Sequence, residues 1–403
     1  MTHPIIIIGT GLAGWNTVRE FRKLDTDTPV LVISADSGDF YAKPSLSNAF
    51  AQKRTPQQLI STPAAKMAES LNVTLLAHTR VEAIDLATQT VRATPAHGEQ
   101  TLHYSRLVLA TGAKAIRVPV QGDAAASVQS INSLDDFAAF HATLSARSTQ
   151  GDGAHGSVKS IVIMGAGLIG CEFANDLLLA GHQVQVVDPS ARPLSALLPE
   201  AAALQLQEAL SAMGVVWRFG TTVQTVQANV SGAAPQPPLT VRLSNGETVQ
   251  AHAVLSAIGL RADTSLAAAA GLLCERGIVV DECLQTSAPQ VYALGDCAQY
   301  ASAGQRALPF ILPIMNAAKA LAANLAGKRT PLVFPLMPVS VKTPALPTVI
   351  ASAHPAQAGN WVGEQVADGG LWRFIDSAGL QRGFVVTGRQ TARRAELAKE
   401  TMP

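Results

Sequence analysis

Short runs of apolar residues alternate along the chain with small-residue turns and with helix-like patterns of apolar and polar positions. The first run is residues 5–8, four isoleucines, which is typical of a strand buried on both faces. A glycine-rich turn follows it, and the pattern then predicts a helix over residues 12–24 and a second strand over residues 30–33. This order predicts a parallel sheet covered by helices.

The turn after the first strand carries glycines at the spacing G-x-G-x-x-G, as Gly9, Gly11 and Gly14. The first allows a tight turn, the second lets the backbone approach a pyrophosphate, and the third lets the helix pack on the strand. The helix N-terminus adds free N–H groups and a partial positive charge. Asp36, just after the second strand, is spaced to hold a ribose hydroxyl. Because glycine-rich turns are common, a purely structural turn remains an alternative for this motif alone.

The same arrangement occurs a second time. Residues 161–164 form another apolar run, residues 165–170 read Gly-Ala-Gly-Leu-Ile-Gly, and a strand predicted over residues 184–187 ends in Asp188. Two such units indicate two nucleotides held by one chain.

Two later predicted strands have similar sequences, because residues 107–112 and 255–259 each consist of apolar residues followed by a turn of small residues, called here a strand exit. Each is expected to leave one nucleotide domain. Residues 291–296 predict another strand with a terminal acid, Asp296, and residues 313–325 an alanine-rich helix. The first domain is therefore expected to resume after about residue 255.

The sequence thus predicts an α/β fold, with two interleaved Rossmann-like three-layer nucleotide-binding domains plus a small α+β C-terminal domain. The proline-rich and then alternating tail is the basis for the C-terminal domain, and glycine- and proline-rich stretches predict loops at residues 149–157 and 232–238. The expected boundaries are residues 1–122 and 255–330 for the first nucleotide domain, 123–254 for the second, and 331–403 for the C-terminal domain.

Composition narrows the function classes. The chain has 403 residues, 48% of them hydrophobic, and a net charge of +1, so nothing calls for nucleic acid or a membrane surface. No apolar run approaches the roughly 20 residues of a membrane span, and the N-terminus has no signal-peptide pattern. The four cysteines are scattered and form no C-x-x-C, which favours a reducing, cytoplasmic location without structural disulfides. The nine histidines show no ligand spacing, so no metal site is predicted.

Together, the two fingerprints, the two strand exits and the sequence Tyr-Ala-Leu-Gly-Asp-Cys-Ala at residues 292–298 resemble the FAD-dependent pyridine-nucleotide reductases. The resemblance covers about the first 330 residues, and residues 41–44 and 339–344 add to it. It implies FAD in the first unit and NADH in the second. It also implies hydride transfer from NADH to FAD and release of single electrons to a small iron protein, with rubredoxin as the expected partner, as in electron transfer to alkane hydroxylation.

The resemblance assigns roles to particular residues. It implies that Lys43 lies near the flavin ring, where a cation favours the charge that reduction creates, and that Glu172 pairs with it and helps to place the nicotinamide. On composition alone, a solvated lysine and a surface glutamate are the alternatives. Asp296 is implied to hold the ribityl chain, against the alternative of a helix N-cap. Lys319 is a weaker candidate for contact with the flavin.

The full set of residues expected at the two cofactors follows from the fingerprints and the resemblance. For FAD it is Gly9, Thr10, Gly11, Leu12, Ala13, Gly14, Ser34, Ala35, Asp36, Lys43, Val81, Ala110, Thr111, Gly112, Gly295, Asp296 and Lys319. For NADH it is Gly165, Gly167, Leu168, Ile169, Gly170, Glu172, Asp188 and Gly259. Asp188 favours NADH because a carboxylate repels a 2′-phosphate, while Arg192 nearby would soften that preference.

Other functions remain open from the residues. A ferredoxin reductase of an oxygenase system would share the same core, and a flavoprotein sensor without enzymatic activity is a further alternative. A flavin peroxidase or oxidase is disfavoured, because residues 37–47 contain no cysteine to supply a thiolate at the flavin. Because rubredoxins are usually acidic, a basic docking surface is expected, with Lys43, Arg261, Lys319 and Lys342 as candidates against the alternative of ordinary solvated charges.

Overall fold

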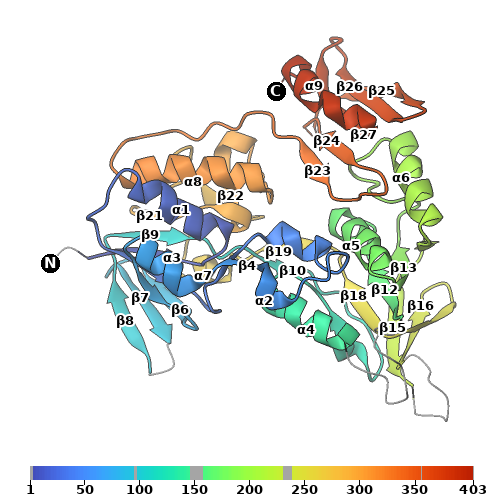
Figure 1. Ribbon diagram of the computed structural model, residues 1–403. Coiled ribbons are helices and arrows are strands. Elements are labelled where there is room, and N and C mark those ends of the chain that lie inside the picture. Colours follow the sequence, from blue (N-terminus) through green and yellow to red (C-terminus); the bar gives the residue numbers. More distant parts are fainter. Residues whose placement is uncertain (1–2, 95–97, 146–157, 230–237, 355, 403) are drawn as a thin grey trace. The chain divides into compact units, whose positions relative to one another are not determined.

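The computed structural model describes residues 3–94, 98–145, 158–229, 238–354 and 356–402 (Figure 1). The chain divides into two compact units, and each is assembled from three separate stretches. Unit 1 comprises Met1–Ala42, Ile60–Lys114 and Leu260–Met337, and unit 2 comprises Lys43–Leu59, Ala115–Gly259 and Pro338–Pro403. The loop predicted over residues 149–157 lies outside the described residues, as does all but residue 238 of the one predicted over 232–238.

Unit 1 is built on a five-stranded parallel sheet in the order β21-β9-β1-β2-β5. Its strands are β1 (Ile5–Ile8), β2 (Val30–Ile33), β5 (Thr74–Leu76), β9 (Arg106–Leu109) and β21 (Val291–Ala293). Helices α1 (Leu12–Arg22) and α8 (Ile311–Leu325) pack against one another (Figure 1). Strand β21 and helix α8 come from the third stretch of the unit, so its core is completed by chain that follows unit 2's nucleotide-binding part.

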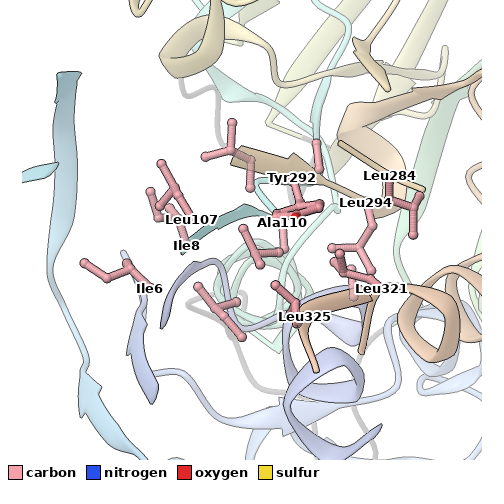
Figure 2. Packing of buried hydrophobic residues seen from close by; sticks show 14 of the residues in the cluster. Ile6, Ile8, Leu107, Ala110, Leu284, Tyr292, Leu294, Leu321 and Leu325 are labelled. Carbon is pink, nitrogen blue, oxygen red and sulfur yellow. The ribbon is translucent and has the colours of Figure 1, made fainter. Parts of the chain in front are cut away.

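The core of unit 1 lies between this sheet and helix α8. Figure 2 shows Ile6 and Leu107 from the sheet, with Tyr292 from β21 and Leu321 and Leu325 from α8, in one buried cluster. Ile6, Leu107 and Leu321 are fully buried, which accounts for the unbroken apolar runs that predicted strands covered on both faces.

Smaller elements complete unit 1. A three-stranded antiparallel sheet consists of β6 (Arg80–Asp85), β7 (Thr90–Thr94) and β8 (Gln100–His103). The other elements are β3 (Phe40–Tyr41), β4 (Ile60–Thr62), α3 (Ala64–Ser70), α7 (Ser265–Ala269), β20 (Ile278–Val280), η3 (Gly295–Cys297), β22 (Ala298–Tyr300) and η4 (Ala301–Ala303). Strands β10 (Ala113–Ala115) and β19 (Leu260–Ala262) pair where the chain passes between the units.

The nucleotide-binding part of unit 2 repeats this plan. Its parallel sheet has the order β11-β18-β12-β13-β14, from β11 (Val128–Gln129), β18 (Ala253–Ser256), β12 (Ser160–Met164), β13 (Gln183–Asp188) and β14 (Val216–Phe219). An antiparallel sheet again accompanies it, from β15 (Val223–Ala228), β16 (Leu239–Leu243) and β17 (Thr248–Ala251). The helices are α4 (Leu134–Ser145), α5 (Leu168–Leu179) and α6 (Glu200–Ala212), with the short η1 (Lys43–Asn48), α2 (Pro56–Leu59) and η2 (Ala125–Ser127).

The C-terminal stretch of unit 2 is a five-stranded antiparallel sheet in the order β23-β24-β27-β26-β25. It consists of β23 (Val339–Val341), β24 (Thr348–Ala351), β25 (Gly359–Val366), β26 (Gly369–Asp376) and β27 (Gln381–Gly388), followed by η5 (Arg389–Arg393) and α9 (Arg394–Glu400). Gln205 of α6 bonds to Thr387 and to the carbonyl oxygen of Gly369. The predicted fold class, two parallel-sheet Rossmann-like domains with a small α+β domain, is confirmed.

In both units a glycine brings the helix after the glycine-rich turn onto the sheet. A Cβ on Gly14 would lie 1.9 Å from the carbonyl oxygen of Gly9, and a Cβ on Gly170 would lie 2.0 Å from that of Gly165. Both of these oxygens belong to the backbone and cannot rotate away from the added methyl group. The third glycine of each fingerprint is therefore required by packing, whatever the turn binds.

We predict that Gly170→Ala destabilises the chain, because α5 must move off its turn to make room for the methyl group. Overpacking of this kind costs about 1–3 kcal/mol. Gly167→Ala is the matched control, since a Cβ there meets no atom within 4 Å and its φ of −76° suits alanine. Urea denaturation without added pyridine nucleotide measures both, and equal free energies of unfolding would contradict the prediction.

Candidate functional site

The two fingerprint turns have the same backbone geometry. Gly9 and Gly165 take φ values of +110° and +104°, and each donates its N–H to the carbonyl oxygen at the end of the neighbouring strand, Ile33 at 2.9 Å and Val187 at 2.8 Å. Such φ values are open to glycine and strained for other residues. Each unit thus turns from strand to helix in the same way.

The second glycine of each turn faces open space. Gly11 caps α1 with φ −67° and ψ −171°, Gly167 caps α5 with φ −76° and ψ −171°, and a Cβ on either would meet no atom within 4 Å. Neither helix has an acidic residue in its first turn, so nothing there competes for the free N–H groups and the positive end of the dipole. Both turns fit a pyrophosphate, as FAD and NADH require.

The acid after the second strand of unit 1 belongs to a short hydroxyl network. Ser34 Oγ donates to Asp36 Oδ1 at 2.5 Å and lies 2.5 Å from Thr10 Oγ1. The N–H of Gly38 donates to the same carboxylate oxygen at 2.9 Å. The network ties the glycine turn to the end of β2 and engages Oδ1, so the exposed carboxylate of Asp36 can accept a ribose hydroxyl on Oδ2.

The corresponding acid of unit 2 also holds its own turn. Asp188 Oδ2 accepts from the N–H of Ala166 and Oδ1 from that of Ser190, both at 2.7 Å. Arg192 makes no ion pair with Asp188 among the described residues, and its Nε is buried without a hydrogen-bond partner there. Arg192 is one of the residues that line a cavity of about 610 Å³, together with Trp361 on β25 of the C-terminal sheet. In the part of the chain that the structure describes, Arg192 therefore does not neutralise the charge of Asp188.

The small-residue strand exits lie against the glycine turns. A Cβ on Gly9 would lie 2.2 Å from the carbonyl oxygen of Ala110, and one on Gly165 would lie 2.7 Å from that of Ala257. Thr111 Oγ1 donates to the carbonyl oxygen of Asp263 at 2.8 Å. The resemblance between the two exits in the sequence thus reflects an equivalent contact in each unit.

Asp296 follows β21 within η3, half-buried, at the same end of the sheet as the first glycine turn. Its neighbour Gly295 packs on α1, since a Cβ there would lie 2.8 Å from that of Ala13, and its N–H donates to Tyr300 Oη at 2.7 Å. Burial raises the pKa of the Tyr300 hydroxyl and of the Cys297 thiol. Both groups stay protonated at neutral pH, so Cys297 is a buried filler without thiolate reactivity.

Helix α5 carries three polar side chains on one face, at the spacing i, i+3 and i+4. Glu172 accepts from Ser47 Oγ at 2.7 Å and from the N–H of Lys342 at 3.0 Å, and forms an ion pair with Lys342 Nζ. The side chain of Glu172 is 5% exposed and that of Lys342 28% exposed. The charge partner found for Glu172 is therefore Lys342, which the sequence suggested as a docking cation.

The other two members of this face hold the same two segments. Asp176 accepts from the N–H groups of Phe50 at 3.0 Å and Ala51 at 2.9 Å, and Asn175 Oδ1 accepts from the N–H of Ala345 at 3.1 Å. Burial raises the pKa of Asp176, against the opposing effect of these hydrogen bonds. Helix α5 therefore joins the segment that begins at Lys43 to the segment that follows β23.

The predicted site residues fall into two groups. Unit 1 contains Gly9, Thr10, Gly11, Leu12, Ala13, Gly14, Ser34, Ala35, Asp36, Val81, Ala110, Thr111, Gly112, Gly295, Asp296 and Lys319, and unit 2 contains Lys43, Gly165, Gly167, Leu168, Ile169, Gly170, Glu172, Asp188 and Gly259. Lys43 is half-buried and Lys319 is exposed on α8. Their cofactor roles stay predictions, as does the pairing of Lys43 with Glu172.

The sequence did not predict Ser47 or Lys342 as a partner of Glu172, and it suggested Lys342 only as a docking cation. One sequence feature indicates that such partners exist, because Glu172, Asn175 and Asp176 form a polar face on a helix that is otherwise apolar. That face predicts partners without naming them, since they lie 125 and 170 residues away along the chain.

Comparisons with known proteins agree with this arrangement. Residues 331–401 match a domain described as Rubredoxin binding C-terminal domain. The chain is 41% identical to "Rubredoxin-NAD(+) reductase" of Alcanivorax borkumensis, over 99% of this chain and 98% of that protein. It is 38% identical to "Nitric oxide reductase FlRd-NAD(+) reductase" of Vibrio vulnificus, again over 99% and 98%.

Solved structures share the fold at low sequence identity. The reductase of the "covalent putidaredoxin reductase-putidaredoxin complex" superposes with a TM-score of 0.85 at 24% identity, covering 99% of this chain and 93% of that one. The "Ferredoxin Reductase for the CYP199A2 System from Rhodopseudomonas palustris" gives 0.84 at 23% identity, covering 100% and 96%.

A second family match covers the nucleotide-binding parts and extends over most of the chain. Residues 3–322 match the family described as Pyridine nucleotide-disulphide oxidoreductase, and they include both glycine turns, both acids and Asp296. Membership implies binding of FAD and NAD(H). No helix among the described residues is long and apolar enough to cross a membrane. The chain is an oxidoreductase that belongs to the pyridine nucleotide-disulphide oxidoreductase family.

Proposed function

We propose that this chain transfers electrons from NADH, through bound FAD, to rubredoxin. The observation that carries the proposal is the combination of two equivalent phosphate-binding turns with a C-terminal sheet that matches a rubredoxin-binding domain. Two relatives of about 40% identity over nearly the whole chain are named for this activity.

Each part of the proposal has its own residues. The turn at Gly9–Gly14 and Asp36 would hold the pyrophosphate and a ribose of FAD, and Asp296 its ribityl chain. The turn at Gly165–Gly170 and Asp188 would hold NADH. Bound FAD supplies the chemistry that converts a hydride into single electrons. The protein supplies binding, orientation and charge at that group.

Within this proposal, Asp188 selects the nucleotide. Its carboxylate is fixed by Ala166 and Ser190, so it cannot swing away from a 2′-phosphate. Arg192 makes no ion pair with this carboxylate among the described residues, and its Nε is buried without a partner there. NADH is therefore the expected donor.

The acceptor is the part for which a second candidate has support. The Vibrio vulnificus relative is named for nitric oxide reductase FlRd and matches over the same length. Anaerobic reduction of rubredoxin, FlRd and a ferredoxin by NADH and this chain decides between them. Fastest turnover with rubredoxin supports the proposal. Failure of NADH to bleach the flavin would instead support a protein without reductase activity.

We predict that Asp296→Ala weakens FAD retention about 5- to 150-fold, because a buried hydroxyl of the ribityl chain loses its partner at a cost of about 1–3 kcal/mol. Flavin fluorescence after dilution of the purified protein measures it. Asp27→Ala, at an exposed position on the same unit, serves as the control. Equal retention by the two variants would contradict a role for Asp296 at FAD.

We predict that wild-type kcat/KM for NADH exceeds that for NADPH by about 100-fold or more, because a fixed like charge opposes the 2′-phosphate. Asp188→Asn should narrow this ratio, whereas Arg192→Gln should leave it unchanged. Comparable kcat/KM values for the two donors in the wild type, or a change of the ratio in Arg192→Gln, would show that Arg192 governs the pocket.

We predict that Lys43→Met lowers the flavin reduction potential, because a fixed cation stabilises the charge that reduction creates. The dissociation constant for NAD⁺ should change little. Spectroelectrochemical titration measures the potential, with Lys66→Met, at an exposed lysine that has no expected cofactor role, as a matched loss of one cation. An unaltered potential in Lys43→Met would rule out this role.

A further inference from the structure

Lys342 directs its ammonium group into the protein. Nζ donates to the carbonyl oxygen of Pro44 at 2.7 Å, to Ser47 Oγ at 2.6 Å and to Glu172 Oε2. An ammonium has three protons, so these three acceptors use all of its donors. The backbone N–H of Lys342 also donates to Glu172 Oε1 at 3.0 Å. Lys342 is thus committed to internal bonds and is not a free cation for docking.

These bonds form a closed circuit. Ser47 Oγ accepts from Lys342 and donates to Glu172 Oε2, which in turn pairs with Lys342. Both oxygens of the buried carboxylate are satisfied, and so is the carbonyl oxygen of Pro44. Charge-assisted bonds of this kind fix geometry as well as contributing energy.

The circuit joins three segments that are distant in sequence. Glu172 lies on α5, two residues beyond the second glycine fingerprint. Pro44 and Ser47 lie on η1, which begins at Lys43, and Lys342 follows β23 at the start of the C-terminal sheet. A single side chain therefore links the C-terminal sheet to α5 and to η1.

We infer that Lys342 is a positioning residue for the reaction with NADH. It holds the carboxylate of Glu172 and the η1 segment in one fixed arrangement beside the second phosphate turn. The functional part of this inference rests on the proposed function, because Glu172 and Lys43 affect the reaction only if a nicotinamide and a flavin are bound. The structural part, that Lys342 fixes η1 against α5, rests only on the hydrogen bonds of the cluster.

The structural part is tested by hydrogen–deuterium exchange. Lys342→Met should raise amide exchange in residues 45–48 about tenfold or more, because Pro44 and Ser47 lose their common donor. The amides of Phe50 and Ala51 stay bonded to Asp176 and should keep their protection. Asn175→Ala is the matched control, since it removes a bond between α5 and the same C-terminal segment and leaves the circuit intact. Equal exchange in both variants would overturn the inference.

The functional part is tested by stopped-flow measurement of the two half-reactions. Flavin reduction by NADH should slow about 10- to 100-fold in Lys342→Met, since small misplacements have costs of this size. Binding of NADH, reoxidation by rubredoxin, and both half-reactions of Asn175→Ala should change by less than about threefold. In a Glu172→Gln background, Lys342→Met should add less than about threefold, because the two residues act as one unit.

The alternatives give different results. Slowing of reoxidation alone, with loss of its salt dependence, would make Lys342 a docking cation and overturn the inference. Additive losses in the double variant would overturn it too. If Lys342→Met fails to fold, Ser47→Ala opens the same circuit, and the same rise in exchange at residues 45–48 is expected. If wild-type protein does not reduce rubredoxin while the exchange contrast stands, the proposed function fails and the positioning of η1 does not.

Discussion

The close contact between a glycine turn and the helix that follows it is the constraint on which this structure depends. At both fingerprints the third glycine lies so near the first that a single methyl group would separate helix from strand. That contact aims the helix N-terminus at the open space beside the second glycine. The phosphate-binding geometry is therefore a consequence of packing within each unit. A site built in this way avoids ordering the backbone at the moment of binding.

Because its position is fixed in this way, helix α5 can serve two roles. Its first turn faces the place of a pyrophosphate, while Glu172, Asn175 and Asp176 hold η1 and the segment after β23. A helix fixed at one end by glycine contacts is a rigid reference for whatever bonds to its side. Among the described residues, only the second unit bonds to the side of its helix in this way: α5 has Glu172 and Asp176 among its buried residues, whereas the buried residues of α1 (Leu12–Arg22) include no acid.

The sequence predicted what depends on local pattern. Apolar runs such as residues 5–8 identified the central strands, and glycine spacing identified both turns, because backbone geometry there admits few other residues. The sequence could not predict the partner of Glu172, because Lys342 is 170 residues away along the chain and no periodic pattern relates the two. The sequence predicted Asp36 and Asp188 at their strand ends. It did not predict their hydrogen bonds to the N–H groups of Gly38 and Ala166, because a sequence motif identifies a residue that contacts a ligand and not the bonds that orient its side chain.

The buried ion pair at Glu172 indicates that this cluster fixes the position of η1, at some expense of stability. Removing two charges from water is costly, and an apolar pair of similar volume is often as stabilising as a buried ion pair or more so. Stability alone would therefore favour leucine or methionine at these positions. An apolar pair, however, accepts many rotations and small shifts, whereas the circuit of Lys342, Ser47 and Glu172 is satisfied in a single arrangement. The stability lost by using an ion pair instead of an apolar pair is tolerable where the position of a segment matters more than its stability. That is expected of η1, because it begins with Lys43, the lysine that the family resemblance assigns to the flavin.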